Sequence, residues 1–177
     1  MEFISTKCVW NLGEPKVYRF SLERIWDANG PFVAFLGLNP STADEHKPDN
    51  TVTRCVNFAN AWGYGGMYML NAFAFRATDP KAMKACENPV GVGNDGRILS
   101  VVSKKEVTKV VLCWGTHAVH QQRNDEMMTL LKKYVRKLYV FDFTKDGHPK
   151  HPLYLPNNIK LKKVRLFDFP RLRKIKL

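Results

Sequence analysis

The fold of this chain is decided by residues 32–44, which read Phe-Val-Ala-Phe-Leu-Gly-Leu-Asn-Pro-Ser-Thr-Ala-Asp. The apolar run at residues 32–36 is typical of a strand buried on both faces of a sheet. Gly37 ends that strand, and Asn39-Pro40 predicts an extended turn because the proline ring disfavours a helical conformation at the residue before it. The polar residues that follow stand at the carboxyl end of a strand, where open α/β sheets bind ligands. An ordinary exit from strand to loop is the alternative, and the ends of the later strands decide between the two.

Strands and helices alternate along the rest of the chain, which favours a parallel sheet with helices on both faces. Further apolar runs predict strands at residues 67–73, 109–114 and 137–143. The segments between the strands predict helices at residues 51–62, 94–103 and 118–135. A short additional helix is expected to end at Cys86, with Thr78 or Asp79 as its N-cap.

Two further segments are expected to lie beside this sheet. Residues 8–27 contain an alternation of apolar and polar side chains and two turns, which predicts an antiparallel hairpin. The tail from Lys160 interleaves basic and apolar residues and predicts an edge strand with a basic outer face. The expected fold is therefore a three-layer α/β sandwich with a central, mainly parallel sheet of four strands, forming one domain over residues 1–177.

The charge balance points to a polyanionic partner. The 177 residues include 28 Lys and Arg against 16 Asp and Glu, which gives a formal net charge of +12. Such a charge favours nucleic acid ahead of an acidic membrane surface, although basic charge that only keeps a protein in solution is the alternative. No signal peptide and no apolar run long enough to cross a bilayer is found, so we expect a cytoplasmic protein without membrane contact.

The four cysteines favour a structural role over metal binding. Cys8, Cys55, Cys86 and Cys113 lie far apart and form no Cys-x-x-Cys pair. Close-spaced thiolates for zinc or an iron–sulfur cluster are therefore missing, and His117 with His120 lacks an evident third ligand. We expect no metal and no other cofactor, and we interpret the cysteines as small core residues.

Polar groups stand at the ends of all four predicted parallel strands. These are Asn39-Pro40-Ser41, the segment from Asn71 to Arg76, Gly115-Thr116-His117, and His148-Pro149-Lys150-His151. A parallel arrangement brings the four ends to one edge of the sheet and into a single cleft. Amides, hydroxyls, imidazoles and an arginine suit reading the edge of a base and holding phosphates better than they suit binding Mg²⁺.

These strand ends resemble the motifs of the uracil-DNA glycosylase superfamily. In that superfamily the first strand ends in Gly-x-Asp-Pro-Tyr or Gly-x-Asn-Pro-Gly, and Gly37-Leu-Asn-Pro-Ser41 stands in that place. The other matches are Met67-Tyr-Met-Leu-Asn71, Val110-Val-Leu-Cys-Trp-Gly115 and Gly147-His-Pro-Lys-His-Pro152. The resemblance covers roughly residues 32–152. With Arg76-Ala-Thr-Asp-Pro80 and His151-Pro-Leu-Tyr154 included, the chain is more closely similar to an uncharacterised bacterial and phage family, the domain of unknown function 1643, which brings no established activity.

The superfamily resemblance implies a DNA glycosylase that flips a base from the helix and hydrolyses its N-glycosidic bond. Asn71 would bind the base edge, with Ser41 and Phe58 beside the base. His148 or His151 would donate a hydrogen bond to the departing base. Phe58 is also a candidate core residue, and Asn71 a candidate loop cap.

Two departures from the superfamily pattern modify this expectation. Asn39 replaces the carboxylate that activates water in the most active members, so chemistry should be slower unless Asp44 or Asp49 substitutes. Ser41 replaces a bulky tyrosine and leaves room at C5 of a pyrimidine. We therefore expect the target to be a modified or mismatched pyrimidine and not plain uracil.

We expect a monomer whose partner is DNA, either a duplex with a flipped base or a single strand. Residues expected to contact it are Arg54, Arg76, Thr116, His117, Lys150, Arg171 and Arg173. Arg76 and Asp79 form either a structural ion pair or a phosphate clamp. Two other functions stay open: a non-catalytic binder of modified bases on the same fold, and an enzyme acting on free nucleotides. The charge of +12 argues against the second of these.

Overall fold

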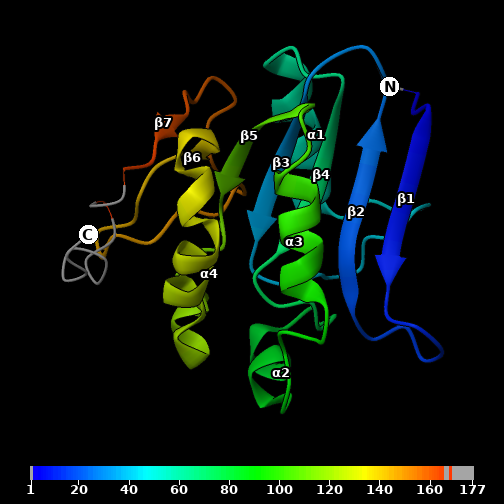
Figure 1. Cartoon of the computed structure of the whole chain (residues 1–177), viewed down its shortest axis with the longest axis vertical. Coiled ribbons are helices and arrows are strands. Elements are labelled where there is room, and N and C mark those ends of the chain that lie inside the picture. Colours follow the sequence, from blue (N-terminus) through cyan, green and yellow to red (C-terminus); the bar gives the residue numbers. More distant parts are fainter. Residues whose placement is uncertain (1, 166–167, 169–177) are drawn as a thin grey trace.

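The computed structural model describes residues 2–165 and 168, and it is a mixed α/β structure built on one seven-stranded sheet (Figure 1). The strand order is β1-β2-β4-β3-β5-β6-β7. The four central strands β4, β3, β5 and β6 are parallel, whereas β1, β2 and β7 run antiparallel to their neighbours. The bounds are β1 Ser5–Trp10, β2 Arg19–Ile25, β3 Phe32–Gly37, β4 Gly66–Asn71, β5 Val107–Leu112, β6 Leu138–Val140 and β7 Lys162–Lys163.

The sheet is larger than the four strands predicted, because the N-terminal hairpin becomes part of it. β2 pairs with β4 from Leu22 opposite Met69 to Ile25 opposite Gly66, and β1 then forms the edge. At the other edge, Lys162 and Lys163 are the residues of the described part of the basic tail that pair with β6. The predicted basic edge strand is thus very short, and residues 166–167 and 169–177 lie outside the described part of the chain.

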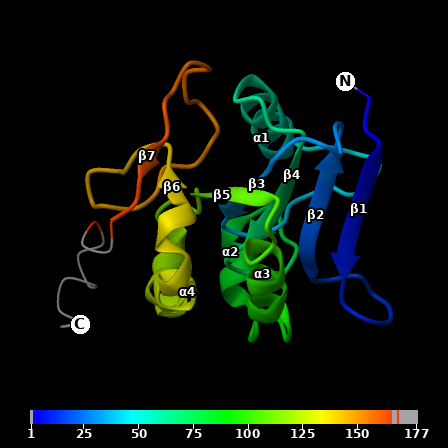
Figure 2. The ribbon, with the colours of Figure 1, turned by 45° about the horizontal axis from the view of Figure 1, so that its top comes forward.

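Helices cover both faces of the sheet (Figure 2). Their bounds are α1 Asn50–Ala61, α2 Pro80–Ala85, α3 Asn94–Val102 and α4 Arg123–Leu131. Helices α2, α3 and α4 share one apolar cluster with Leu36 of β3, whereas α1 packs in a second cluster with Phe35. Neighbouring residues of a strand point to opposite faces, so the apolar run of β3 supplies both layers and is buried at all six positions.

The connections create a crevice at the carboxyl edge of the sheet. From β3 the chain passes through α1 to β4 on one side, and then through α2 and α3 to β5 on the other side of β3. The loops that leave β3 and β5 therefore diverge to opposite faces. In open α/β sheets such a reversal of strand order is the preferred place for a ligand.

One predicted helix is wrong in its length. Instead of a single helix over residues 118–135, the chain forms a 3₁₀ turn at His117–Gln122, the helix α4, and a second 3₁₀ turn at Lys132–Lys137. Gln121 and Gln122 are left-handed, with φ of 51° and 57°. Arg123 follows them and is buried, with Nε donating to the Ala72 oxygen at 2.8 Å. A periodic apolar pattern does not reveal a buried arginine that fixes the start of a helix.

Most of the remaining elements lie close to their predicted positions, but the strand predicted at residues 137–143 is shorter: β6 is Leu138–Val140, and Phe143 forms an isolated bridge with Pro149 instead. Helix α2 is capped by Asp79, whose carboxylate accepts the Lys81 N–H at 2.8 Å, so the second of the two candidate caps is correct. Cys8, Cys55 and Cys113 are buried thiols and Cys86 is half-buried. Within the described residues, no helix combines the length and the apolar character that a membrane crossing requires.

Candidate functional site

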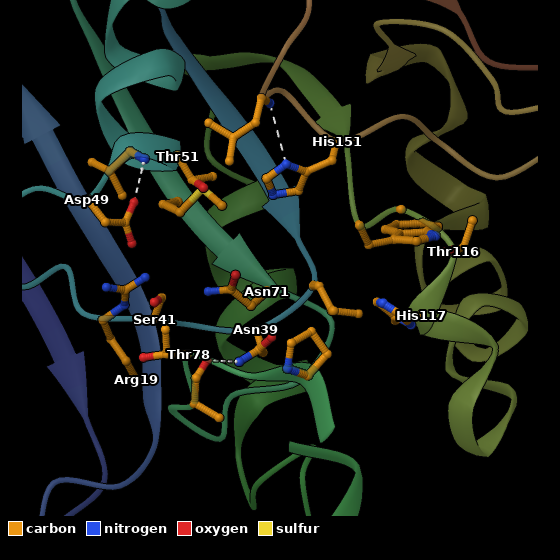
Figure 3. A pocket seen from close by; sticks show the side chains of 18 residues that line it. Arg19, Asn39, Ser41, Asp49, Thr51, Asn71, Thr78, Thr116, His117 and His151 are labelled. Atoms are coloured by element: carbon orange, nitrogen blue, oxygen red, sulfur yellow. Dashed lines mark hydrogen bonds between the residues drawn. The ribbon is translucent and has the colours of Figure 1, made fainter. Parts of the chain in front are cut away.

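A pocket of about 420 Å³ opens at the carboxyl edge of the parallel strands (Figure 3). Its walls come from the segments that follow β3, β4, β5 and β6, together with the start of β2 and the N-terminus of α1. The volume lies in the range of small-molecule sites. The pocket contains seven of the candidate residues, namely Asn39, Ser41, Asp49, Asn71, Thr116, His117 and His151.

Asn71, the last residue of β4, carries an amide with unused hydrogen-bonding capacity. Its side chain is fully buried, and neither Oδ1 nor Nδ2 has a hydrogen-bond partner among the described residues. Leaving a buried polar group unpaired costs about 1–3 kcal/mol. Figure 3 shows the amide in the middle of the pocket, between His151 and Asn39. The arrangement leaves the amide nitrogen as a donor and the amide oxygen as an acceptor for a ligand.

The residues around Asn71 hold it in place. Asn94, the first residue of α3, donates its Nδ2 to the Asn71 oxygen at 3.0 Å and to the Ala72 oxygen at 3.2 Å. On β3, a Cβ added to Gly37 would lie 3.1 Å from Asn71 Oδ1 and 2.6 Å from the Met69 methyl carbon. Glycine at position 37 thus leaves the space that the amide occupies.

Asn39 lies in the pocket, but half of its amide is committed to the fold. Its Nδ2 donates to the Ala77 oxygen at 2.7 Å and to the Pro40 oxygen at 3.0 Å. The bond to Ala77 ties the loop after β3 to the loop after β4. Its Oδ1 has no hydrogen bond among the described residues, so this oxygen is free to accept one.

His151 and Asp49 are the titratable pair of the pocket. The Nδ1 atom of His151 accepts the Leu153 N–H at 3.4 Å, which leaves the proton on Nε2 in the neutral ring. Burial lowers the pKa of His151, and the charge of Asp49 opposes this only in part. Asp49 caps α1 by accepting the Val52 N–H at 2.8 Å through one oxygen. Its second oxygen has no hydrogen bond within the described chain.

Arg19 is a pocket residue that the sequence reading missed. It begins β2, is 1% exposed, and lines the pocket beside Ser41 (Figure 3). Its Nη1 donates to the Ala43 oxygen, whereas Nε is buried without a partner among the described residues. Burial lowers the pKa of Arg19, and the nearby Asp49 charge opposes that shift. The pairing of β1 with β2 is irregular at Trp10, opposite Arg19, and such a bulge can re-aim a side chain against simple alternation.

Three arginines hold the backbone of residues 41–44. Arg76 donates from Nε to the Ser41 oxygen at 2.7 Å and from Nη2 to the Thr42 oxygen at 2.8 Å. Arg19 donates to the Ala43 oxygen, and Arg24 donates to the Asp44 oxygen at 2.5 Å. We call this set the arginine bracket. Arg76 therefore supports the loop from outside the pocket, and no ion pair joins it to Asp79 in the described structure.

Several candidate residues lie outside the pocket because each has another role. The Asp44 carboxylate accepts the N–H groups of His46 and Lys47, at 2.9 and 2.8 Å, and these bonds lower its pKa. Phe58 is a core residue, with ring centroids 5.4 Å from Trp62 and 4.8 Å from Phe141. The aromatic residue that does line the pocket is Trp114, at the end of β5.

Other residues that were predicted to act on DNA make contacts within the protein instead. Arg54 donates to the Leu155 oxygen and to Asn157, and so fastens the C-terminal segment to α1. Lys150 pairs with Asp142 at 3.2 Å, and the two lysines at that carboxyl, Lys162 foremost, hold the pKa of Asp142 at about 2. His148 belongs to a turn in which its N–H donates to Thr144 Oγ1. Arg171 and Arg173 lie outside the described residues.

The rim of the pocket is formed by exposed residues. Thr78, Thr116 and His117 are all exposed, and His117 Nδ1 lies 3.2 Å from the Lys84 ammonium. Across the described residues, no three His, Cys, Asp or Glu side chains gather where they could hold a metal ion. The chemistry available in the pocket is thus that of amides, hydroxyls, two imidazoles, one carboxylate and one guanidinium.

Comparison with known proteins identifies a family but no function. Searches of curated proteins and of solved structures find no match. The family described as "Protein of unknown function (DUF1643)" matches residues 19–153, which is more than half of the chain and runs from Arg19 in β2 to Leu153 at the pocket. The chain therefore belongs to the DUF1643 family.

Proposed function

We propose that the pocket receives a single nucleobase extruded from DNA and that the protein hydrolyses its N-glycosidic bond. The observation that carries this proposal is the buried amide of Asn71, whose donor and acceptor both lack partners in the described structure. The edge of a pyrimidine offers a complementary acceptor and donor side by side, and an amide can pair with both.

The walls of the pocket suit a flat ring. Leu38, Met69 and Trp114 line it, and an aromatic or apolar surface against the face of a base is a common way to hold one. The resemblance of the strand ends to motifs of the uracil-DNA glycosylase superfamily supports this proposal. Asn39, Asn71 and His151, which come from three of those motifs, all line the one pocket.

The proposed reaction uses Asp49 and His151. As the bond between C1′ and the base nitrogen breaks, the Nε2–H of His151 donates a hydrogen bond to the negative charge that develops on the base. Asp49 stabilises the cationic sugar and accepts a proton from the water whose oxygen bonds to C1′. The base leaves as an anion and takes a proton from the solvent. Asp49 then releases to the solvent the proton that it accepted from the water. In this proposal Asp49 activates the water, which Asn39 cannot do because it has no carboxylate. Asp44, the other candidate, lies outside the pocket.

The proposed substrate is a modified or mismatched pyrimidine. Ser41 lines the pocket, and its small side chain leaves room for a substituent on the ring. The net charge of +12 favours DNA as the carrier of that base. A binder without catalysis is the second candidate. Asn39 stands where the superfamily resemblance places a catalytic carboxylate, and its Nδ2 atom is used to bind the Ala77 and Pro40 oxygens instead.

Mass spectrometry of bases released from oligonucleotides tests the proposal. The substrates carry uracil, a mismatched thymine or a 5-substituted pyrimidine, and the variant is Asp49→Asn. We expect release of a substituted or mismatched base by the wild type and a loss of about 10²–10⁴ in rate for the variant. Asp44→Asn is the matched control and should keep the activity.

Each of the other outcomes would reject one part of the proposal or all of it. Binding of a base without release by any variant would replace the glycosylase with the binder. A preference for plain uracil would remove the proposed substrate class, and absence of both binding and release would end the proposal.

A further inference from the structure

Arg19 is a buried cation without a buried counter-ion. The residue is 1% exposed, and no carboxylate lies at ion-pair distance from it in the described structure. It spends one of its N–H donors on the Ala43 oxygen, and its Nε has no partner among the described residues. Burying an unpaired charge is costly, so such groups are normally paired.

Comparison within the arginine bracket separates Arg19 from the other two members. Arg76 uses Nε and Nη2 on the Ser41 and Thr42 oxygens, and Arg24 uses both terminal nitrogens on backbone oxygens. Neither of them lines the pocket, whereas Arg19 does. Support of the loop therefore accounts for Arg24 and Arg76 but leaves most of the Arg19 guanidinium unexplained.

Asp49 is the one carboxylate of the pocket that acts on Arg19. The Asp49 carboxylate lies on the same side of the pocket as Arg19 in the view of Figure 3, and one of its oxygens is occupied by the Val52 N–H. Arg24 and Arg76 also act on Arg19, and both add positive charge. Asp44 acts on both of these arginines and Glu45 acts on Arg24, but neither carboxylate lines the pocket, so Asp49 is the only acid that Arg19 meets among the described pocket residues.

The depth of Arg19 indicates which part of a ligand it meets. Arg19 and Asn71 are buried and form the floor of the pocket, whereas Thr116 and His117 are exposed at the rim. A group bound by Arg19 is thus inserted together with the part of the ligand that Asn71 reads.

We propose that Arg19 is the binding site for an oxyanion, a carboxylate or phosphate group carried by the ligand of this pocket. In the nucleobase reading, on which the choice of probes rests, the oxyanion is an acidic substituent on the ring. In a free nucleotide it is the 5′-phosphate. The planar guanidinium offers paired N–H donors that match the two oxygens of either group.

Inorganic phosphate tests the oxyanion site without any base. Thermal unfolding of the wild type, Arg19→Gln and Arg76→Gln is compared in phosphate and in chloride at matched ionic strength. General salting effects raise the unfolding temperature of all three proteins alike, whereas binding at Arg19 adds a shift that Arg19→Gln lacks and Arg76→Gln keeps. Equal shifts in all three proteins overturn the proposal.

Two ligand pairs then identify the source of the oxyanion by isothermal titration calorimetry. The first pair is thymine and 5-carboxyuracil, and the second is thymidine and thymidine 5′-monophosphate. We expect the acidic member of one pair to bind about tenfold or more tightly than its neutral mate, because a charge-assisted hydrogen bond contributes that much. Arg19→Gln should abolish the preference, Arg19→Lys should keep part of it, and Arg76→Gln should keep all of it.

The outcomes separate this proposal from the proposed function. If phosphate stabilises the protein through Arg19 but no base binds, the oxyanion site stands and the nucleobase site fails. If thymine binds and neither acidic ligand gains affinity from Arg19, the nucleobase site stands and the oxyanion site fails. A preference that survives Arg19→Gln likewise overturns the oxyanion site.

Discussion

Asn94 donates a hydrogen bond from its side-chain Nδ2 to the backbone oxygen of Asn71 at 3.0 Å. The bond joins the first turn of α3 to the last residue of β4, and both residues are fully buried. Arg123 supports the next residue in the same way, through the Ala72 oxygen. The backbone that carries the pocket amide is thus fixed from behind by two side chains that do not line the pocket.

Replacing Asn94 with alanine should destabilise the protein by about 1–3 kcal/mol, because a buried carbonyl loses its donor. Urea unfolding measures the change in the free energy of unfolding. Asn57→Ala, at an exposed position of α1, is the control and should stay near the wild type. A neutral Asn94→Ala variant would show that the contact does not fix the end of β4.

Replacing Asn71 with leucine should raise the free energy of unfolding, while ligand binding is lost. The leucine side chain is similar in size and removes two buried polar atoms that lack partners in the described structure. Replacing such groups with an apolar side chain of the same shape is nearly neutral or stabilising, by on the order of 1 kcal/mol. The same urea series measures it, and marked destabilisation would mean that the amide is needed for folding.

The free energy of unfolding should decrease as the pH is lowered, because of the titration of His151. Burial lowers the pKa of His151 in the folded state below its value of about 6.5 in the unfolded chain. The unfolded state therefore takes up the proton first, and stability decreases as the pH falls from about 6.5 toward the folded pKa. The free energy of unfolding is measured with urea between pH 5 and pH 7, buffer conditions that bracket the pKa of an ordinary histidine. It should change less with pH in the His151→Gln variant than in the wild type. A His151→Gln variant that keeps the slope of the wild type would contradict this prediction.

Thiol alkylation at pH 8, near the ordinary pKa of a cysteine, should modify Cys86 first in the folded protein. Burial raises the pKa of Cys8 and of Cys113 to about 12, and raises that of Cys55 well above its ordinary value. These three thiols are protonated and enclosed, and only the thiolate reacts. Intact-mass spectrometry should find one fast modification, which Cys86→Ser removes, and four modifications after denaturation.

The pattern of apolar residues was sufficient to predict the buried central strands, of which residues 32–37 are an example. β3 is buried on both faces, so its sequence is an unbroken apolar run, and its ends coincide with the predicted ones. Parallel strands also share one carboxyl edge. For this reason Asn39, Asn71 and His151 line one pocket although they lie far apart in the chain.

The parts that were not predicted depend on contacts between distant residues. Asp44 and Asp49 are equivalent in the sequence, but a local turn occupies the carboxylate of Asp44 while Asp49 caps α1 at the pocket. Phe58 shares its helix face with Cys55 and Ala59, and that periodicity already pointed to the core. Arg19 and Arg123 are buried arginines, for which a sequence pattern gives no signal.

The arginine bracket has a consequence for how quickly a ligand can enter. Residues 41–44 cannot swing aside without breaking hydrogen bonds to three guanidinium groups, two of them on β2 and one on the segment that follows β4. The wall of the pocket that contains Ser41 is thus held in place before a ligand binds. Association should follow a single kinetic phase whose rate rises linearly with ligand concentration, and a co-crystal structure should superimpose on the free protein at these residues.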